Sequence, residues 1–216
     1  MIELDNWITV DGDISLKTAK RRGDDVIENY QKEEIDRSIV HCKKKRIAID
    51  IGSHLGIISY QLSQQFQQVH SFEISPEIYN CSVENLKRQQ VSNVVLHNHG
   101  LGNTVEYVDL DIPGKTLGTH ISPNSKGKYE VRTLDEYNLN CVDFIKIDVE
   151  GYEAKVIQGA METIKRCKPI ILYERKGHSL KYGYGNDAPF DMLRSIGYRK
   201  IEDIGEAKKN RIIGVR

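Results

Sequence analysis

The stretch IAIDIGSHLG, residues Ile47 to Gly56, decides the fold expected for this chain. Its β-branched apolar run ends at Asp50 and two spaced glycines, and an amphipathic segment follows. A second apolar run, VHSFEIS at Val69 to Ser75, ends in Glu73. A strand, a glycine turn, a helix and a second strand ending in an acid are typical of a βαβ nucleotide-binding unit. We therefore expect a cofactor site at the turn after the first strand.

The rest of the chain repeats this alternation of buried strands and helices. Further strands are predicted at residues 94–97, 142–147, 169–173, 198–204 and 211–215. The last two should form an antiparallel hairpin at a sheet edge. One helix, with apolar residues at helical spacing, is predicted from about Gly151 to residue 164. The chain thus predicts an α/β, Rossmann-like domain with a mostly parallel seven-stranded sheet, helices on both faces and an antiparallel last strand.

Length and composition fit one cytoplasmic domain. The chain has 216 residues, of which 39% are hydrophobic, and its 31 basic residues balance 31 acidic ones. This neutrality gives no reason to expect nucleic acid as a partner. The four cysteines lack paired spacing and are expected to be reduced thiols. We see no signal peptide and no apolar run long enough to cross a membrane.

Two segments depart from the repeating pattern. Residues 1–46 read as an N-terminal extension, with one helix over Glu33 to His41, that packs on the domain formed by residues 47–216. Residues 103–134 alternate in polarity around a loop rich in Gly, Pro, Ser and Asn, which favours a β-excursion.

The turn after the first strand narrows the choice of cofactor. A dinucleotide fingerprint, G-x-G-x-x-G, would need glycines at 54 and 57, where the chain has His54 and Ile57. The acid-x-G-x-G-x-G loop of S-adenosylmethionine enzymes fits better, with the middle glycine replaced. Histidine is among the residues that tolerate a positive φ there. An NAD-dependent oxidoreductase is therefore the least favoured cofactor enzyme.

Two further groups complete the expected cofactor site. Glu73 lies 23 positions after Asp50, where a carboxylate can accept hydrogen bonds from ribose hydroxyls. The alternative is an acid that merely flanks the next helix. Asn98, His99 and Gly100 end the third strand and are candidates for contacting an adenine, mainly through the backbone.

The sequence resembles the FkbM-type family of S-adenosylmethionine-dependent methyltransferases. The resemblance covers roughly Ile47 to Glu174. It rests on AIDIGSHLG, SFEISPE, VVLHNHGLGN, RTLDEY, DFIKIDVEGYEAKVIQGA and PIILYE. It implies a class I methyltransferase fold and methyl transfer to a hydroxyl, often on a sugar or natural product. His54 stands where the family often has Asn, and Ile74 replaces a common proline.

The resemblance also implies residue roles. Asp50 and the turn would hold the methionine portion, Glu73 the ribose and Gly100 the adenine edge. Asp148 would face the transferable methyl group. The predicted cofactor-binding residues are Asp50, Gly52, Ser53, His54, Gly56, Glu73, Ile74, Asn98, His99, Gly100 and Asp148.

An alcohol acceptor also needs a base to remove its proton. The candidates are Asp148, Glu150, Glu174 and His178. Glu150 has an alternative role as an acid in the first turn of a helix, and His178 as a surface residue. Asp148 with either glutamate could bind a divalent ion, but no spacing demands one, and we predict no metal site.

A basic loop follows the fifth strand of the pattern. Arg175, Lys176 and Lys181, beside Tyr182 and Tyr184, could form a mobile lid over a sugar or an anionic acceptor. A solvated, glycine-rich loop is the alternative.

The sequence therefore favours O-methylation of a sugar or another small molecule with S-adenosylmethionine. The alternatives are methylation of nucleic acid ribose, which the neutral charge and lack of a basic, aromatic stripe disfavour, and a cofactor-binding module without turnover. The acceptor and the oligomeric state remain open at this stage.

Overall fold

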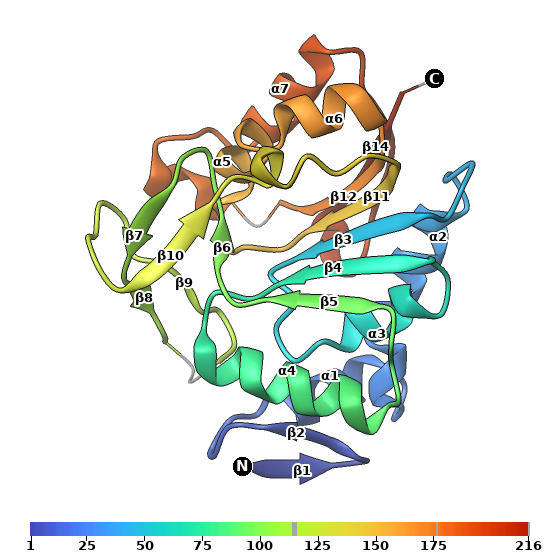
Figure 1. Ribbon diagram of the computed structural model, residues 1–216, viewed down its shortest axis with the longest axis vertical. Helices are drawn as coiled ribbons and strands as arrows, with labels where there is room; N and C mark the ends of the chain where they lie inside the picture. Colours follow the sequence, from blue (N-terminus) through green and yellow to red (C-terminus); the bar gives the residue numbers. More distant parts are fainter. Residues whose placement is uncertain (114–115, 176, 216) are drawn as a thin grey trace.

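A seven-stranded sheet forms the centre of the protein. The computed structural model describes residues 1–113, 116–175 and 177–215. The strand order is β13-β14-β12-β11-β3-β4-β5 (Figure 1). The strands are β3 (Ile47–Ile51), β4 (Gln68–Phe72), β5 (Val94–His97), β11 (Val142–Ile147), β12 (Ile170–Glu174), β13 (Arg199–Ile204) and β14 (Asn210–Gly214). The strands from β12 to β5 pair in parallel, whereas β14 is antiparallel to both its neighbours, as the sequence predicts.

Helices cover both faces of this sheet, because its strands are apolar on both sides. Ile171 and Tyr173 of β12 face one core, shared with α5 (Glu153–Gln158), α6 (Met161–Cys167) and α7 (Ala188–Ser195). Ile170 and Leu172 face a second core, shared with α2 (Lys32–Ile39) and α3 (Ile57–Ser63). Helix α4 (Pro76–Arg88) follows β4. Among the described residues, no helix is long and apolar enough to span a bilayer.

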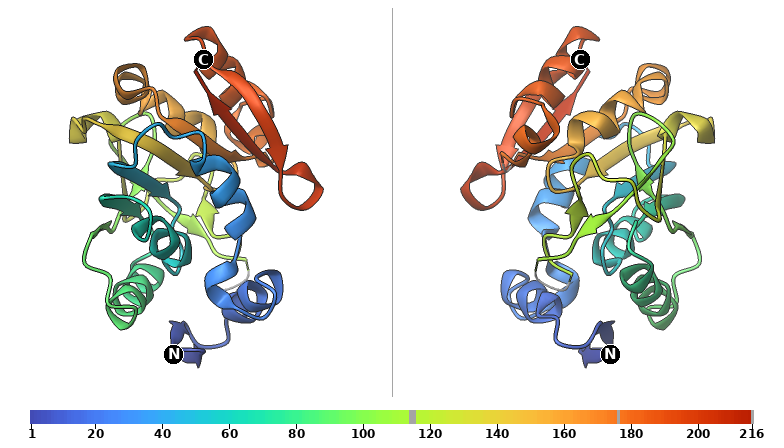
Figure 2. Two further views of the ribbon diagram at one scale, coloured as in Figure 1. Left: turned by 90° about the vertical axis from the view of Figure 1, so that its right-hand side faces the viewer. Right: turned by 90° about the vertical axis from the view of Figure 1, so that its left-hand side faces the viewer.

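The N-terminal segment is more structured than the single helix that the sequence predicts. Besides α2 it contains a hairpin of β1 (Ile2–Leu4) and β2 (Trp7–Thr9), helix α1 (Ser15–Arg22) and η1 (Ile27–Asn29). Trp7 and Leu16 are fully buried in a third core with Leu55 and Ile78. Although α2 shares the second core with Ile204 and Ile212 of the C-terminal strands, the side views show the β1–β2 hairpin at the opposite end of the molecule from the C-terminus (Figure 2), and its Trp7 packs with Leu55 of the turn. The segment therefore packs beside the turn that follows β3.

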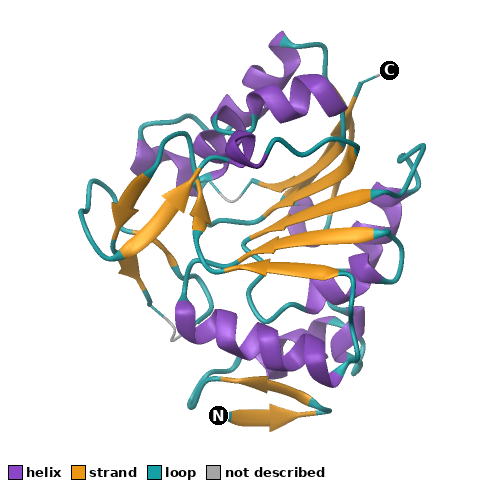
Figure 3. Cartoon of the chain, in the orientation of Figure 1, coloured by secondary structure: helices purple, strands orange, loops and turns teal. Residues whose placement is uncertain are grey.

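The β-excursion lies at one end of the central sheet (Figure 3). It contains β6 (Gly100–Leu101), β7 (Glu106–Val108), β8 (Leu110–Asp111), β9 (His120–Ile121) and β10 (Tyr129–Arg132). These strands form one three-stranded and one two-stranded sheet. The turns η2 (Leu134–Tyr137), η3 (His178–Tyr182) and η4 (Glu206–Lys208) complete the fold.

The helix predicted from about Gly151 starts close to that residue but is not continuous. It begins at Glu153, since Glu150 and Gly151 have positive φ angles of 52° and 109°. It also breaks into α5 and α6 at Gly159, where a Cβ atom would lie only 1.8 Å from the Gly102 carbonyl oxygen. Apolar spacing cannot reveal such a break, because both pieces keep the same buried side.

Candidate active site

The turn after β3 adopts the strained backbone that its glycines predict. Gly52, His54 and Gly56 have φ angles of 79°, 51° and 83°. His54 thus occupies the left-handed region, as expected from the sequence. A Cβ atom on Gly52 would lie 2.0 Å from the carbonyl oxygen of Asp148. The missing side chain lets the turn pack directly against the carboxyl end of β11.

Glu73 is buried next to this turn and is held at both carboxylate oxygens. Oε2 accepts a hydrogen bond from the His54 backbone N–H, and Oε1 accepts one from the Ser75 N–H, both at 2.9 Å. The side chain is only 6% exposed. Burial raises the pKa of Glu73 to about 7, although these hydrogen bonds oppose the rise. The carboxylate is therefore oriented toward the cavity next to it, and its charge is costly to maintain.

A cavity of about 310 Å³ opens at the carboxyl ends of the parallel strands. Its volume lies at the lower end of the usual range for ligand pockets. Of the predicted site residues, those that line it are Gly52, Ser53, His54, Glu73, Ile74, Gly100, Asp148 and Glu150. Those outside the lining are Asp50, Gly56, Asn98, His99, Glu174 and His178. The cavity thus unites the turn, the end of β4, β6 and the end of β11.

The predicted cofactor residues outside the lining support those within it. The Asn98 side-chain amide donates to the backbone carbonyl of Glu73 at 2.9 Å. Asp50 is fully buried beneath the turn, where it accepts a hydrogen bond from Ser59 Oγ at 2.7 Å. Gly56 packs against α4, since a Cβ atom there would lie 2.6 Å from Ser82 Oγ.

Two described residues of the lining carry a buried polar atom without a hydrogen-bond partner. Within the described ranges, Ser53 Oγ and His54 Nε2 are buried and have no hydrogen-bond partner. Buried polar atoms are normally paired. Burial lowers the pKa of His54 to about 4, so its ring is neutral at physiological pH. Together with Glu73, these atoms fit a polar, hydroxyl-bearing cofactor.

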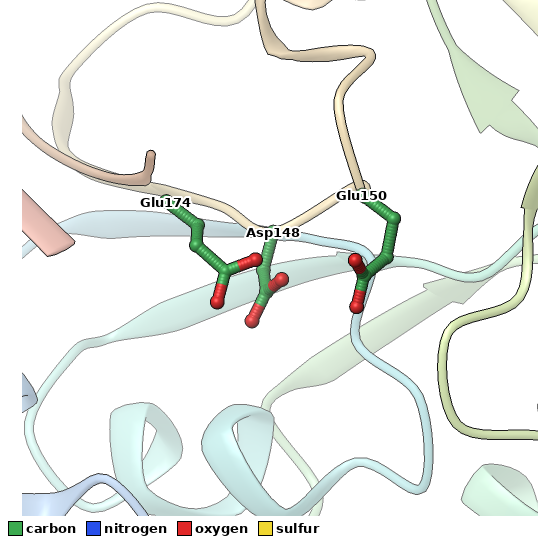
Figure 4. A group of neighbouring side chains, drawn as sticks. All are labelled: Asp148, Glu150 and Glu174. Carbon is green, nitrogen blue, oxygen red and sulfur yellow. The ribbon is translucent and has the colours of Figure 1, made fainter. Parts of the chain in front are cut away.

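Three acids lie close together at the carboxyl ends of β11 and β12 (Figure 4), and two of them, Asp148 and Glu150, line the cavity. Carboxylate oxygens of Asp148, Glu150 and Glu174, here called the carboxylate cluster, all lie within 4.8 Å of one another. Such a set could hold a divalent cation. Lys146 already brings a positive charge, with Nζ 3.3 Å from Asp148 Oδ2 and 4.0 Å from Asp50 Oδ1. Burial lowers the pKa of Lys146, but these carboxylates outweigh it and hold the pKa above its usual value.

The structure gives His178 the partner that the sequence did not reveal. Its Nδ1 lies 3.0 Å from Glu150 Oε2. The two residues are 28 positions apart, and Gly151 allows them to meet, because a Cβ atom there would lie 2.7 Å from the His178 carbonyl group. Glu150 precedes α5 in a left-handed conformation, so it lies outside the helix first turn that was the alternative explanation for this acid.

The cavity also has a wall that the sequence did not predict. It is formed by Ser15, Thr18, Ala19 and Arg22 of α1, by Tyr30, and by residues 116–121. The only sequence signal for α1 was its amphipathic pattern, which reports burial and not a ligand site.

The basic loop after β12 lies outside this wall. Arg175 Nη2 is 2.8 Å from Asp187 Oδ1, and Lys181 lies over the Tyr182 ring. The Tyr182 hydroxyl donates to the Ile121 carbonyl at 2.6 Å, which ties the loop to β9. Lys176 lies outside the described residues. Neither Arg175 nor Lys181 lines the cavity, so the structure gives no support to the predicted lid.

Several solved structures of other proteins share this fold. Methyltransferase FkbM from Methylobacillus flagellatus KT shares 16% identity with a TM-score of 0.53, over 79% of this chain and 43% of that protein. The chain thus spans less than half the length of that relative. The Streptococcus mutans protein SMU.1697c, in complex with SAH, shares 12% identity with a TM-score of 0.54, over 85% and 96% of the two chains.

A SAM dependent methyltransferase from Aquifex aeolicus shares 14% identity with a TM-score of 0.54, over 98% of both chains. At these identities the likeness shows the fold, which is that of class I methyltransferases. No curated protein matches the sequence significantly. The sequence profile described as the Methyltransferase FkbM domain matches residues 50–200, which is more than half of the chain. The protein therefore belongs to the FkbM methyltransferase domain family.

Proposed function

We propose that this protein transfers a methyl group from S-adenosylmethionine to a hydroxyl of a sugar or another small molecule. The observation that carries the proposal is the position of the hydrogen-bonded Glu150–His178 pair beside Asp148, at the edge of the cofactor cavity. S-adenosylmethionine supplies an electrophilic methyl group. The work of the chain is to hold the cofactor, align the acceptor hydroxyl and take its proton.

The proposed cofactor-binding residues are those predicted cofactor residues that line the cavity. Glu73 is placed to accept hydrogen bonds from the ribose hydroxyls, and Gly100 lets the adenine edge approach the backbone. Ser53 Oγ and His54 Nε2 supply polar atoms for the methionine end. Asp148, held by Lys146, keeps negative charge near a cationic sulfonium. Alignment of this kind can lower a barrier by roughly 7 to 11 kcal/mol.

Glu150 is the proposed base. It lines the cavity, whereas His178 lies behind it and donates a hydrogen bond from Nδ1 to the carboxylate. Glu150 would take the proton of the acceptor hydroxyl as that oxygen forms its bond to the methyl group, while the sulfur–methyl bond would break with its electron pair staying on the departing S-adenosylhomocysteine. His178 acts as a positioning residue, because it fixes the direction in which the carboxylate points.

The acceptor is proposed to enter past α1 and residues 116–121, which form the remaining wall of the cavity. The four free cysteines are consistent with a reducing, cytoplasmic setting.

The test is methyl transfer to a panel of sugars, hydroxylated small molecules and RNA. Glu150→Gln should lower kcat by about 10² to 10⁴ without changing cofactor affinity, as expected for loss of a base. His178→Ala should lower kcat less. His178→Asn, which keeps a donor at the position of Nδ1, should have a kcat close to that of the wild type. His41→Ala, at an exposed histidine, is the control. An unchanged kcat in Glu150→Gln would refute the assignment of Glu150 as the base. Methyl transfer to RNA alone would refute a sugar or another small molecule as the acceptor.

A further inference from the structure

Three histidines and a tyrosine form a continuous row behind the adenine side of the cavity. His70 Nδ1 lies 3.1 Å from His97 Nε2. His97 Nδ1 lies 3.5 Å from the Tyr137 hydroxyl, which is 2.5 Å from His99 Nε2. His99 Nδ1 lies 3.0 Å from the Gly100 carbonyl oxygen. The row thus links β4, β5, η2 and β6, and none of these four side chains lines the cavity.

Hydrogen-bonding rules give the row one direction when its imidazoles are neutral. The Gly100 carbonyl can only accept, so His99 carries its proton on Nδ1 and accepts at Nε2. The Tyr137 hydroxyl must then donate its single proton to His99. It can only accept from His97, whose proton is therefore also on Nδ1.

The same reasoning fixes the last member of the row. A neutral His97 with its proton on Nδ1 accepts at Nε2, so His70 donates from Nδ1. All four contacts are satisfied only when every imidazole carries its proton on Nδ1. The rings also stack, with 5.4 Å between the centroids of His70 and His97 and 4.4 Å between those of His97 and Phe72.

The surroundings favour the neutral form. Burial lowers the pKa of His70 and His99, and it lowers the pKa of His97 to about 4. Three charged groups face the Tyr137 end: Arg132 disfavours a charged His99, whereas Glu130 and Glu136 favour it more weakly. His97 faces His70 and His99, which both disfavour its charge.

We infer that His70, His97, Tyr137 and His99 are positioning residues, which form a directed hydrogen-bond chain that fixes the Gly100 carbonyl and so sets the adenine wall of the cofactor cavity. Gly100 is the point where the chain meets the cavity. The fit there is close, since a Cβ atom on Gly100 would lie 2.8 Å from Ile74 Cδ1. A displacement of Gly100 would therefore change its close packing against Ile74 and alter the shape of this wall. The inference rests on the proposed cofactor site only through this wall.

The chain itself is tested without any ligand. Nitrogen-15 NMR of the histidine side chains at pH 7.5 should show all three rings protonated on Nδ1, which is the minor tautomer of free histidine. A ring protonated on Nε2 instead of Nδ1 in His70, His97 or His99 would overturn the directed chain.

The positioning role is tested with two substitutions of similar size. His99→Asn keeps a donor near the position of Nδ1 but loses the contact with Tyr137, so its Kd for S-adenosylmethionine should rise by less than that of His99→Gln. His99→Gln reaches toward Tyr137 but loses the Gly100 link, and its Kd should rise at least about fivefold. Tyr107→Phe, at an exposed tyrosine, is the control. Equal Kd values for the two His99 variants would overturn the positioning role. Failure of wild type to bind would instead refute the proposed cofactor, with the NMR result unaffected.

Discussion

Replacement of Glu73 by Gln should separate cofactor binding from stability. The pKa of this carboxyl is raised from 4.5 to about 7, chiefly by burial. That change corresponds to about 3 kcal/mol against the ionised form at high pH. Gln removes the buried charge, but its amide NH₂ must then face the N–H of His54 or Ser75, at a cost of about 1 to 3 kcal/mol. We therefore expect a net gain of about 1 kcal/mol, or a Tm about 2 to 4 °C higher at pH 8.

The gain should depend on pH with a definite sign. Because the pKa of Glu73 is raised in the folded state, the folded protein binds this proton more tightly than the unfolded chain. Wild-type stability from this group is present below pH 4.5 and is lost as pH rises through about 7. The advantage of Glu73→Gln should accordingly disappear near pH 4.5 and be largest above pH 7.

Cofactor affinity should change in the opposite direction. Glu73 is proposed to accept hydrogen bonds from the ribose hydroxyls, and the neutral Gln side chain would lose the charge assistance of such a bond, which is worth about 1.5 to 3 kcal/mol. The Kd for S-adenosylmethionine should rise about 10- to 100-fold. Calorimetry and thermal melts at pH 8 and pH 5 measure both effects, with Glu77→Gln, exposed on α4, as the control. A lower Tm at pH 8 with an unchanged Kd would refute the reasoning.

Three further perturbations test other parts of the site. Gly52→Ala should lose at least about 2 kcal/mol in chemical denaturation, since its Cβ atom would meet the Asp148 carbonyl at 2.0 Å; Gly185→Ala, in open space, is the control, and equal losses would contradict the close approach. EDTA should leave turnover within about twofold, because Lys146 already offsets charge beside the carboxylate cluster; a strict Mg²⁺ requirement would make that cluster a metal site. Arg175→Ala should leave acceptor KM unchanged, because Arg175 pairs with Asp187. A raised acceptor KM would instead support the hypothesis that the basic loop covers the acceptor.

The central sheet could be predicted because its signals are local. Each buried strand is a short apolar run, and the glycine turn and Glu73 mark the first crossover directly in the sequence. Ser53, His54 and Gly100 line the cavity as that local pattern indicates. The break at Gly159 was missed because it depends on contact with Gly102, which belongs to a different element.

The rest of the site depends on contacts between distant parts of the chain. Glu150 and His178 can pair only because Gly151 has no side chain that would clash with the η3 backbone. The spacing of residues in the sequence does not indicate this contact. The cavity wall from α1 likewise arises because Trp7 and Leu16 pack the N-terminal segment against the turn. Apolar patterns show which residues are buried but not against which partner.

The most direct test of the central claim is calorimetry of the wild type and of Glu73→Ala with S-adenosylmethionine and, separately, with NAD. The wild type should bind S-adenosylmethionine and show no heat with NAD, and Glu73→Ala should bind S-adenosylmethionine at least about tenfold more weakly. Absence of S-adenosylmethionine binding by the folded wild type, or tighter binding of NAD, would contradict the account.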